Sequence, residues 1–496
     1  MQIASAQTAD EYANFNLSTG VVGTKGTRCS SSLIENVGDG WYRCTATLTN
    51  GTNQVYFCIA NSASMGWFAT STYAGANTTD GLFLYGAQLV EGTEAKDYYP
   101  TETRLNIPRL DYSLGGCPSI LVEPQRTNLV TYSEQLNDAS WTKTECSITA
   151  NIAASPSGIL NADKIIPNTT NTFHPCKKSI TVSSGLAHAY TVYLKKDGYN
   201  YVLINTPTGV IGGNVGPVID LNNGTIVGNL GGSTHNAVVT SINDGWYKVT
   251  MTFTTTGTTT IIDINTLATS SITSYSGNGT DGILVWGAQL EAGSYPTSYI
   301  PTTSASVTRN ADVITKTGIS SLIGQTEGTI FFDGVINGCQ NVSANLLNSE
   351  RTTTASFYIS YIKATSEIKV GLFSSGTQPA TFSGGSVAIG DRVKIAYAYK
   401  SGNNALYING IMIDSNTNTF TLPTTLDNIY IGDQTSYFSF SESIRNNATA
   451  LWKERLTDGE LSILTSGIYT PELAYAAIGL TSESPACLES SINAIL

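Results

Sequence analysis

The chain has 496 residues, which is too long for one hydrophobic core and suggests about three domains. Charged residues make up only 12 % and the formal net charge is −12, so nucleic acid and anionic membranes are poor candidates for partners. Hydrophobic residues reach 41 %, and β-branched and aromatic residues are abundant without long helical patterns. This composition predicts an all-β protein of tandem antiparallel β-sandwich or jelly-roll domains with few short helices.

One sequence module occurs twice in the chain. The tetrapeptide DGWY at 39–42 recurs at 244–247, and GAQL at 86–89 recurs at 287–290. In each copy, Asp-Gly predicts a tight hairpin turn and Trp-Tyr opens the next strand. Short strands at this spacing are typical of a jelly roll, in whose core we expect three tryptophans, Trp41, Trp246 and Trp286.

The two copies differ in length. Residues 1–104 contain only the C-terminal half of the module, whereas residues 131–303 contain a complete jelly roll, because 131–204 have no counterpart in the first copy. Either a boundary of the chain removes the missing half or a partner chain completes it. Residues 105–130, rich in Pro and Gly, are predicted to form an extended linker.

Residues 304–470 are predicted to form a second kind of antiparallel sandwich. Asn409-Gly410 is a strong two-residue hairpin signal, and Thr457 with Glu460 forms a capping box that begins a short helix ending near Ser466. The tail, 471–496, has the pattern of one further short helix. Expected strands are Thr329–Asp333, Ala355–Lys363, Ile368–Phe373, Arg392–Lys400, Ala405–Asp414 and Asn428–Gly432.

The beginning of the chain shows no signal peptide, and no run of 18 apolar residues predicts a membrane span. The eight cysteines are scattered and contain no C-x-x-C, which favours free thiols in a protein folded in a reducing cytoplasm. Cys44 and Cys58 are the best pair if a disulfide forms.

Three stretches resemble tail-fibre and receptor-binding proteins of tailed bacteriophages: CPSILVEPQRTNLVTYSEQ at 117–135, the DGWY…WGAQLE module, and 296–333. The repeated module is similar to their carbohydrate-binding-module-like jelly rolls. Residues 304–470, with ALYINGIMID, look like a concanavalin A-like or laminin G-like lectin domain. The resemblance implies a virion protein, assembled in the host bacterial cytoplasm, on the tail or the head.

This resemblance also implies partners. Such proteins are usually homotrimers that contact other virion proteins and bind bacterial surface polysaccharide. Because no heptads predict a coiled-coil stalk, a trimer of this chain would have to pack side by side. The charge pattern gives no reason to expect nucleic acid or membrane insertion.

No catalytic constellation is visible, so we expect no enzyme activity. The strand motif E-x-D-x-E of concanavalin-like glucanases is absent, and the acidic residues of the last domain stand singly. The three histidines, His174, His188 and His235, accompany no G-x-S-x-G. The alternative to structural roles for His174 and His188 is an approach to Cys176. We expect no cofactor and no catalytic metal; a structural calcium ion on backbone and Asp oxygens stays open. The G-x-G-x-x-G at 277–282 precedes a strand and is interpreted as a hairpin loop.

Glycan binding needs flat apolar faces bordered by polar groups, and aromatic side chains supply such faces. The candidate glycan-binding residues are Tyr437, Phe438, Tyr358, Tyr361, Tyr199 and Tyr201. The leading hypothesis is a phage adhesin, a tail fibre or receptor-binding subunit, that recognises bacterial surface glycans without catalysis. The alternatives are a structural head-fibre or capsid-decoration protein that uses the modules as spacers, and a glycan depolymerase.

Overall fold

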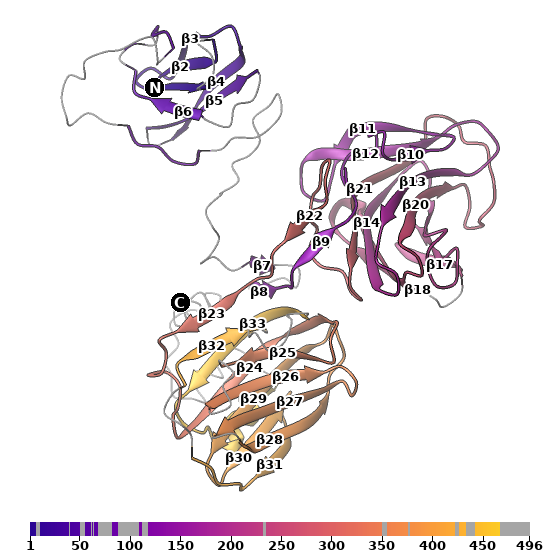
Figure 1. Cartoon of the computed structure of the whole chain (residues 1–496). Coiled ribbons are helices and arrows are strands. Elements are labelled where there is room, and N and C mark those ends of the chain that lie inside the picture. Colours follow the sequence, from indigo (N-terminus) through magenta and orange to yellow (C-terminus); the bar gives the residue numbers. More distant parts are fainter. Residues whose placement is uncertain are drawn as a thin grey trace. The chain divides into compact units, whose positions relative to one another are not determined.

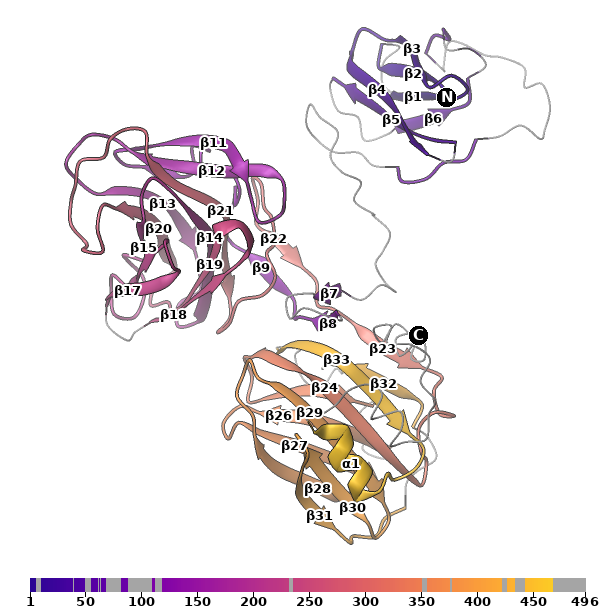
Figure 2. The ribbon, with the colours of Figure 1, turned by 180° about the vertical axis from the view of Figure 1, so that it is seen from behind.

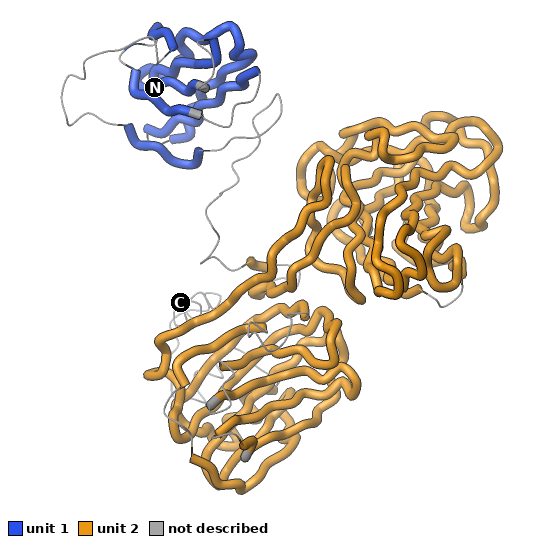
Figure 3. The backbone as a smooth tube through the Cα atoms, in the orientation of Figure 1, with its two compact units in different colours: residues 1–107 blue, residues 108–496 orange. Residues whose placement is uncertain are grey.

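The computed structural model divides the chain into two compact units, Met1–Ile107 and Pro108–Leu496 (Figure 3). Both are built from antiparallel strands, and the described residues contain a single α-helix (Figure 1). The all-β prediction is therefore confirmed. The structure describes residues 1–466 apart from 6–9, 39, 50–54, 61, 63, 68–81, 88–108, 112–117, 232–234, 350–354, 375–376, 422–425 and 433–441.

The first unit consists of a four-stranded sheet and a two-stranded sheet. The larger sheet has the order β3-β2-β1-β6, and the smaller pairs β4 with β5. Ile3, Ala13, Phe15 and Cys29 form a small core between them. The strands are β1 Gln2–Ser5, β2 Tyr12–Asn16, β3 Val21–Lys25, β4 Cys29–Gly38, β5 Trp41–Leu48 and β6 Val55–Cys58.

In the second unit, residues 131–303, here called the second module, form a sandwich of two six-stranded sheets. Alternate residues of facing strands, such as Ile204, Ile264 and Val192, meet in one core. One sheet has the order β10-β13-β20-β15-β16-β17, with β10 Thr142–Lys143, β13 His174–Thr181, β20 Thr259–Leu267, β15 Tyr201–Asn205, β16 Gly216–Asp220 and β17 Thr225–Leu230. The other has the order β11-β12-β21-β14-β19-β18, with β11 Cys146–Ala154, β12 Leu160–Pro167, β21 Gly282–Ala292, β14 Ala187–Asp197, β19 Tyr247–Thr254 and β18 His235–Ser241.

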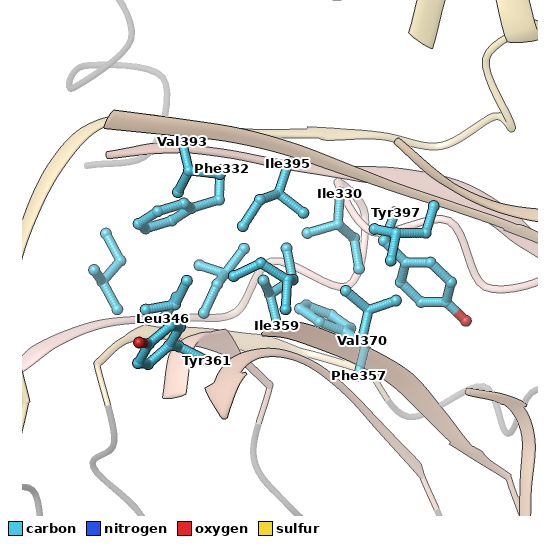
Figure 4. Packing of buried hydrophobic residues seen from close by; sticks show 14 of the residues in the cluster. Ile330, Phe332, Leu346, Phe357, Ile359, Tyr361, Val370, Val393, Ile395 and Tyr397 are labelled. Atoms are coloured by element: carbon cyan, nitrogen blue, oxygen red, sulfur yellow. The ribbon is translucent and has the colours of Figure 1, made fainter. Parts of the chain in front are cut away.

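The C-terminal sandwich packs a six-stranded sheet against a seven-stranded one, and Figure 4 shows side chains such as Phe332 and Phe357 meeting between them. The six strands are β23 Ile314–Thr317, β32 Asn428–Ile431, β25 Ser343–Asn348, β26 Ala355–Ile362, β27 Glu367–Ser374 and β28 Thr377–Ser386. The seven are β31 Ile411–Asn416, β30 Asn404–Ile408, β29 Arg392–Lys400, β24 Glu327–Cys339, β33 Glu442–Trp452, β8 Ser119–Val122 and β7 Arg109–Asp111.

The single helix, α1 (Asp458–Thr465), covers the outer face of the seven-stranded sheet (Figure 2). Leu461 and Leu464 pack there against Phe331, Ala396 and Tyr407. The predicted capping box is confirmed: the Thr457 hydroxyl accepts from the Glu460 backbone, and the Glu460 carboxylate accepts from the Thr457 backbone. No helix among the described residues has the length and hydropathy needed to cross a membrane.

The residues expected as a linker, 105–130, contain three strands. β8 joins the seven-stranded sheet of the C-terminal sandwich, where Val122 is opposite Ile444 of β33. β9 (Arg126–Asn128) pairs with β22 (Val307–Arg309), so the chain enters and leaves the second module side by side. The strands of this segment are therefore hydrogen-bonded to the C-terminal sandwich through β8 and to the exit segment of the second module through β9. In chain order, a strand of the C-terminal sandwich comes before the second module.

The hairpin predictions from Asn409-Gly410 and Asp244-Gly245 are confirmed, whereas Asp39 of the first copy lies outside the described residues. Asn409 and Gly410 both have positive φ between β30 and β31, and so do Asp244 and Gly245 between β18 and β19. Positive φ at both central residues is the geometry of a type I′ turn. Cys44 and Cys58 are free thiols, and they lie in different sheets. The proposed C-terminal helix in 471–496 falls outside the described residues.

Candidate functional site

The polar side chains of interest lie on the outer face of the sheet β10-β13-β20-β15-β16-β17, the face turned away from the core. Along β20, Ile262 and Ile264 point into the core, so Asp263 and Asn265 point outward. The antiparallel register sets Lys177 of β13 opposite Asp263, and Asp263 opposite Asn205 of β15. These three residues form one row across three strands, here called the polar row.

Two members of the polar row, Asp263 and Asn205, are buried and incompletely hydrogen-bonded, whereas Lys177 is partly exposed. Asp263 is 8 % exposed and Asn205 is 3 % exposed, yet Oδ1 of each has no hydrogen-bond partner. The Asn205 amide nitrogen donates to Asn214 Oδ1 at 2.7 Å. A buried acceptor without a donor costs about 1–3 kcal/mol, so these two oxygens in adjacent positions need donors from outside the chain, such as water or a ligand.

Electrostatics make Asp263 the most unusual group on this face. Burial raises its pKa to about 7, and the nearby ammonium of Lys177 opposes the rise. Near neutral pH, the carboxyl is therefore divided between its neutral and ionised forms. A ligand that donates hydroxyl hydrogens to both oxygens would favour the ionised form.

An apolar patch adjoins the polar row. Leu203, Val218 and Leu267 are buried on the same face and pack with the partly exposed Tyr201. In the register, Leu203 lies two residues from Asn205, and Tyr201 lies two residues further. The outer face thus offers hydrogen-bond acceptors at one end and an apolar surface with a phenol at the other.

The loop 268–281, between β20 and β21, is anchored at Thr266 and His174, which by alternation lie on the core-facing side of the sheet, opposite the polar row. The Tyr275 hydroxyl donates to Thr266 Oγ1 at 2.8 Å, and its ring stands against the His174 ring with centroids 4.8 Å apart. The two ring nitrogens of the buried His174 approach the carbonyl oxygens of Glu145 (2.6 Å) and Tyr275 (3.0 Å). His174 is therefore a structural anchor for the loop.

The structure separates the predicted aromatic residues. Tyr201 lies on the outer face just described, while the Tyr199 ring packs on Tyr275 at 5.5 Å. In the C-terminal sandwich, Tyr358 lies on the outer face of its sheet and donates to Gln378 Oε1 at 3.2 Å. Tyr361 is 2 % exposed and belongs to the core in Figure 4. Tyr437 and Phe438 lie outside the described residues.

The histidine, cysteine and carboxylate groups considered as catalytic candidates have structural roles. His188 stacks on Phe253, and Cys176 is buried in the core, where burial raises the pKa of its thiol. Asp333 bonds Arg392 through both oxygens, and Glu327 binds Lys400. In the part of the chain that the structure describes, no three His, Cys, Asp or Glu side chains are grouped so that they could hold a metal ion.

Sequence reasoning missed Asp263, Asn205 and Lys177. The available signal was the alternation Ile262-Asp263-Ile264-Asn265, in which polar residues occupy every second position of an otherwise apolar strand. Trp41 was also expected in a core, and this expectation was wrong: Trp41 is 44 % exposed, whereas Trp246 and Trp286 are buried.

No family model and no curated protein matches the chain. Among solved structures, a similar one is the CBM40 of Ruminococcus gnavus IT-sialidase bound to α2,3-sialyllactose, with 16 % identity over 31 % of this chain and 97 % of that one, at a TM-score of 0.26. The heptameric SAP-like pentraxin of Limulus polyphemus has 14 % identity over 31 % and 73 % of the two chains, at 0.22. The botulinum neurotoxin type G receptor-binding domain has 13 % over 28 % and 37 %, at 0.24. At these scores the similarities do not bear on ligand or activity.

Proposed function

We propose that this chain is a non-enzymatic adhesin that binds a glycan on the outer face of the second module. The observation that carries the proposal is the pair of buried, unpartnered oxygens of Asp263 and Asn205 in one row. Sugars present closely spaced hydroxyl donors, which are the groups that these acceptors lack. The adjoining apolar patch with Tyr201 would receive the C–H face of a sugar ring.

The spacing of carboxylates on this face favours glycan binding rather than glycan hydrolysis. Glycoside hydrolysis uses two carboxyl groups separated by about 5–9.5 Å. The next acidic residue on this face is Asp220, which is opposite Tyr201, whereas Asp263 is opposite Asn205. Four residues along β15 separate these positions, or about 13 Å at strand spacing. Among the described residues of this face, Asp263 therefore has no second carboxylate at the separation that retaining or inverting hydrolysis requires.

We propose that this binding function belongs to a bacteriophage virion, in which the chain is a tail fibre or receptor-binding subunit that recognises bacterial surface polysaccharide. The motifs at 117–135 and 296–333 and the repeated module support this role. A homotrimer in contact with other virion proteins belongs to the same proposal. The alternatives remain a head-fibre or decoration protein in which the modules are spacers, and a depolymerase.

The binding proposal is tested with purified bacterial capsules and lipopolysaccharides immobilised on an array, followed by titration calorimetry on the polysaccharides that bind. Asp263→Asn and Asn205→Ala should weaken binding at least about tenfold, as expected for one hydrogen bond to a charged group. Asp244→Asn is the matched control, because Asp244 lies in the β18–β19 turn and its positive φ suits Asn.

The outcomes separate the alternatives. A spacer would give no selective signal from the unaltered chain on any polysaccharide. A depolymerase would release reducing sugar ends from the polysaccharide that it binds. Binding that Asp263→Asn and Asn205→Ala leave unchanged would remove the outer face of the second module as the site.

A further inference from the structure

The first unit repeats one part of the second module strand for strand. Its four-stranded sheet, read as β6-β1-β2-β3, corresponds to β20-β15-β16-β17, and its β4-β5 hairpin corresponds to β18-β19. Among the described residues of the first unit, strands corresponding to β12 and β14 are absent. The second module therefore shows what packs on this arrangement when it is complete.

In the second module, β14 lies between β19 and β21. β14 pairs with β19 from Ala187 opposite Thr254 to Leu194 opposite Tyr247. On its other edge, β14 pairs with β21, which carries the GAQL motif. β14 is thus inserted between the counterparts of β5 and of residues 82–87.

The residues that β14 and its neighbours cover in the second module are exposed in the first unit. Trp246, Leu284 and Trp286 are 2 %, 6 % and 6 % exposed, and they pack with Ala162 of β12 and Tyr193 of β14. Their counterparts, at offsets of 205 (246 − 41) and 201 (284 − 83), are Trp41, Phe83 and Tyr85, which are 44 %, 89 % and 76 % exposed.

Aromatic side chains gather at this position in both copies, and in the second module Trp246 and Trp286 lie in one cluster with Tyr193 of β14. The Trp41 and Tyr85 rings meet edge to face with centroids 6.5 Å apart. In the second module, the Tyr193 ring of β14 lies 5.0 Å from Trp286. The first unit therefore presents one side of an interface that the chain forms completely in its second copy.

We propose that the first unit docks an extended β-strand of another protein, which would lie between β5 and residues 82–87 in the position that β14 takes in the second module. The strand would carry an aromatic residue like Tyr193 against Trp41 and Tyr85, with alternate residues turned to the small core around Phe15. The occupant is not β14 of a second copy, because both edges of that strand are already paired within its own module.

The test uses the full chain and a fluorescein-labelled peptide with the sequence of residues 187–197, AHAYTVYLKKD, as the strand probe. Fluorescence polarisation should show saturable binding of one peptide per chain. The same peptide with Tyr193→Ser should bind at least about tenfold more weakly, since buried aromatic anchors dominate such interfaces.

Two variants of the chain locate the site. Phe83→Ser and Tyr85→Ser remove exposed side chains, so they leave folding intact, and each should weaken peptide binding at least about tenfold. Val342→Ser is the matched control, because Val342 is 78 % exposed and lies in the second unit. It should leave the peptide affinity unchanged.

Either of two results would overturn the proposal. The first is no saturable binding at peptide concentrations up to about 1 mM, which corresponds to a binding free energy weaker than about −4 kcal/mol. The second is a dimer in sedimentation equilibrium that Tyr85→Ser dissociates, since the face would then belong to a second copy. Polysaccharide binding by these variants is measured in parallel, and its persistence separates this inference from the proposed glycan site.

Discussion

The side chain of Asn128 and the backbone of Leu290 are hydrogen-bonded across 162 residues of chain, with Asn128 Oδ1 accepting from the Leu290 amide at 3.1 Å. The Asn128 amide nitrogen donates to the carbonyl oxygens of Ala288 (3.2 Å) and Ile300 (2.8 Å). Asn128 is fully buried. One side chain therefore joins the entry segment, the GAQL strand and the exit segment of the second module.

Asn128→Ala should lower the free energy of unfolding of the second module by about 2–5 kcal/mol, because it leaves several buried backbone groups without partners. Differential scanning calorimetry of the full chain measures this as a shift of the module's transition. Asn222→Ala is the control: Asn222 is exposed, and its loss should change stability by no more than about 0.5 kcal/mol. Equal shifts for the two variants would contradict the role assigned to Asn128.

Glu123 should be the most sensitive charge at the junction of β8, β9 and the exit segment. It is 4 % exposed, and its carboxylate accepts from Arg109 (2.9 Å) and from the Ser298 backbone (3.0 Å) and forms an ion pair with Arg309 (3.2 Å). Glu123→Ala leaves the partly buried Arg309 without its ion-pair partner and Arg109 with Asp312 alone, and should cost about 3–5 kcal/mol in urea denaturation.

The comparison for Glu123 is a surface ion pair. Lys400 is half exposed where it binds Glu327, so Lys400→Ala should cost at most about 1 kcal/mol. Added salt should reduce the stability contributed by the Lys400–Glu327 pair more than that contributed by Glu123, because exposed ion pairs are screened much more than buried ones. A Glu123→Ala variant as stable as Lys400→Ala would show that the junction is dispensable for stability.

Gly338 of β24 has no room for a side chain. A Cβ at this position would lie 2.3 Å from Cγ of Tyr295, a buried residue of the exit segment whose ring also lies under the Arg126 guanidinium at 5.2 Å. Gly338→Ala should therefore destabilise the second unit by about 1–3 kcal/mol through overpacking. Gly459→Ala points into open space in α1 and should instead stabilise by about 0.5–1 kcal/mol. The melting temperatures should move in opposite directions.

Asp263 predicts a pH dependence of stability. Its pKa is raised from 3.8 to about 7, so the folded module holds a proton that the unfolded chain releases. The stabilisation is complete below about pH 4 and is lost as pH rises through about 7, by an amount on the order of 4 kcal/mol. Asp263→Asn should flatten this part of the calorimetric pH profile. A profile unchanged by the substitution would mean that the pKa of Asp263 is the same in the folded and the unfolded module.

Local signals in the sequence predicted the fold well. Asn409-Gly410, Asp244-Gly245 and the Thr457 capping box each specify a backbone geometry within a few residues. The strands predicted for the C-terminal sandwich overlap β24, β26, β27, β29, β30 with β31, and β32, whereas β25, β28 and β33 were not predicted. The pairing of β8 with β33 was not predictable in this way, because a register between distant strands leaves no local pattern.

The candidate site was harder to predict than the fold, because its residues are also brought together by the register of strands. Asp263 and Asn205 meet only through the register of β20 and β15, so neither is part of a contiguous motif. Tyr358 and Tyr361 are three residues apart on β26, which places them on opposite faces, and only the structure decides which face is the core. Whether these tyrosines or the polar row bind glycan stays a prediction.

The pairing of Val122 with Ile444 sets the timing of folding during synthesis. β8 emerges from the ribosome 322 residues (444 − 122) before its partner strand. At roughly 5–20 residues per second, β7 and β8 wait on the order of 16–64 s while the whole second module is made and can fold. The C-terminal sandwich is thus completed last, although its strands β7 and β8 are synthesised before the second module. A translational pause beyond residue 303 would prolong the time for which β8 is not paired with β33, because the second module is already complete at that point.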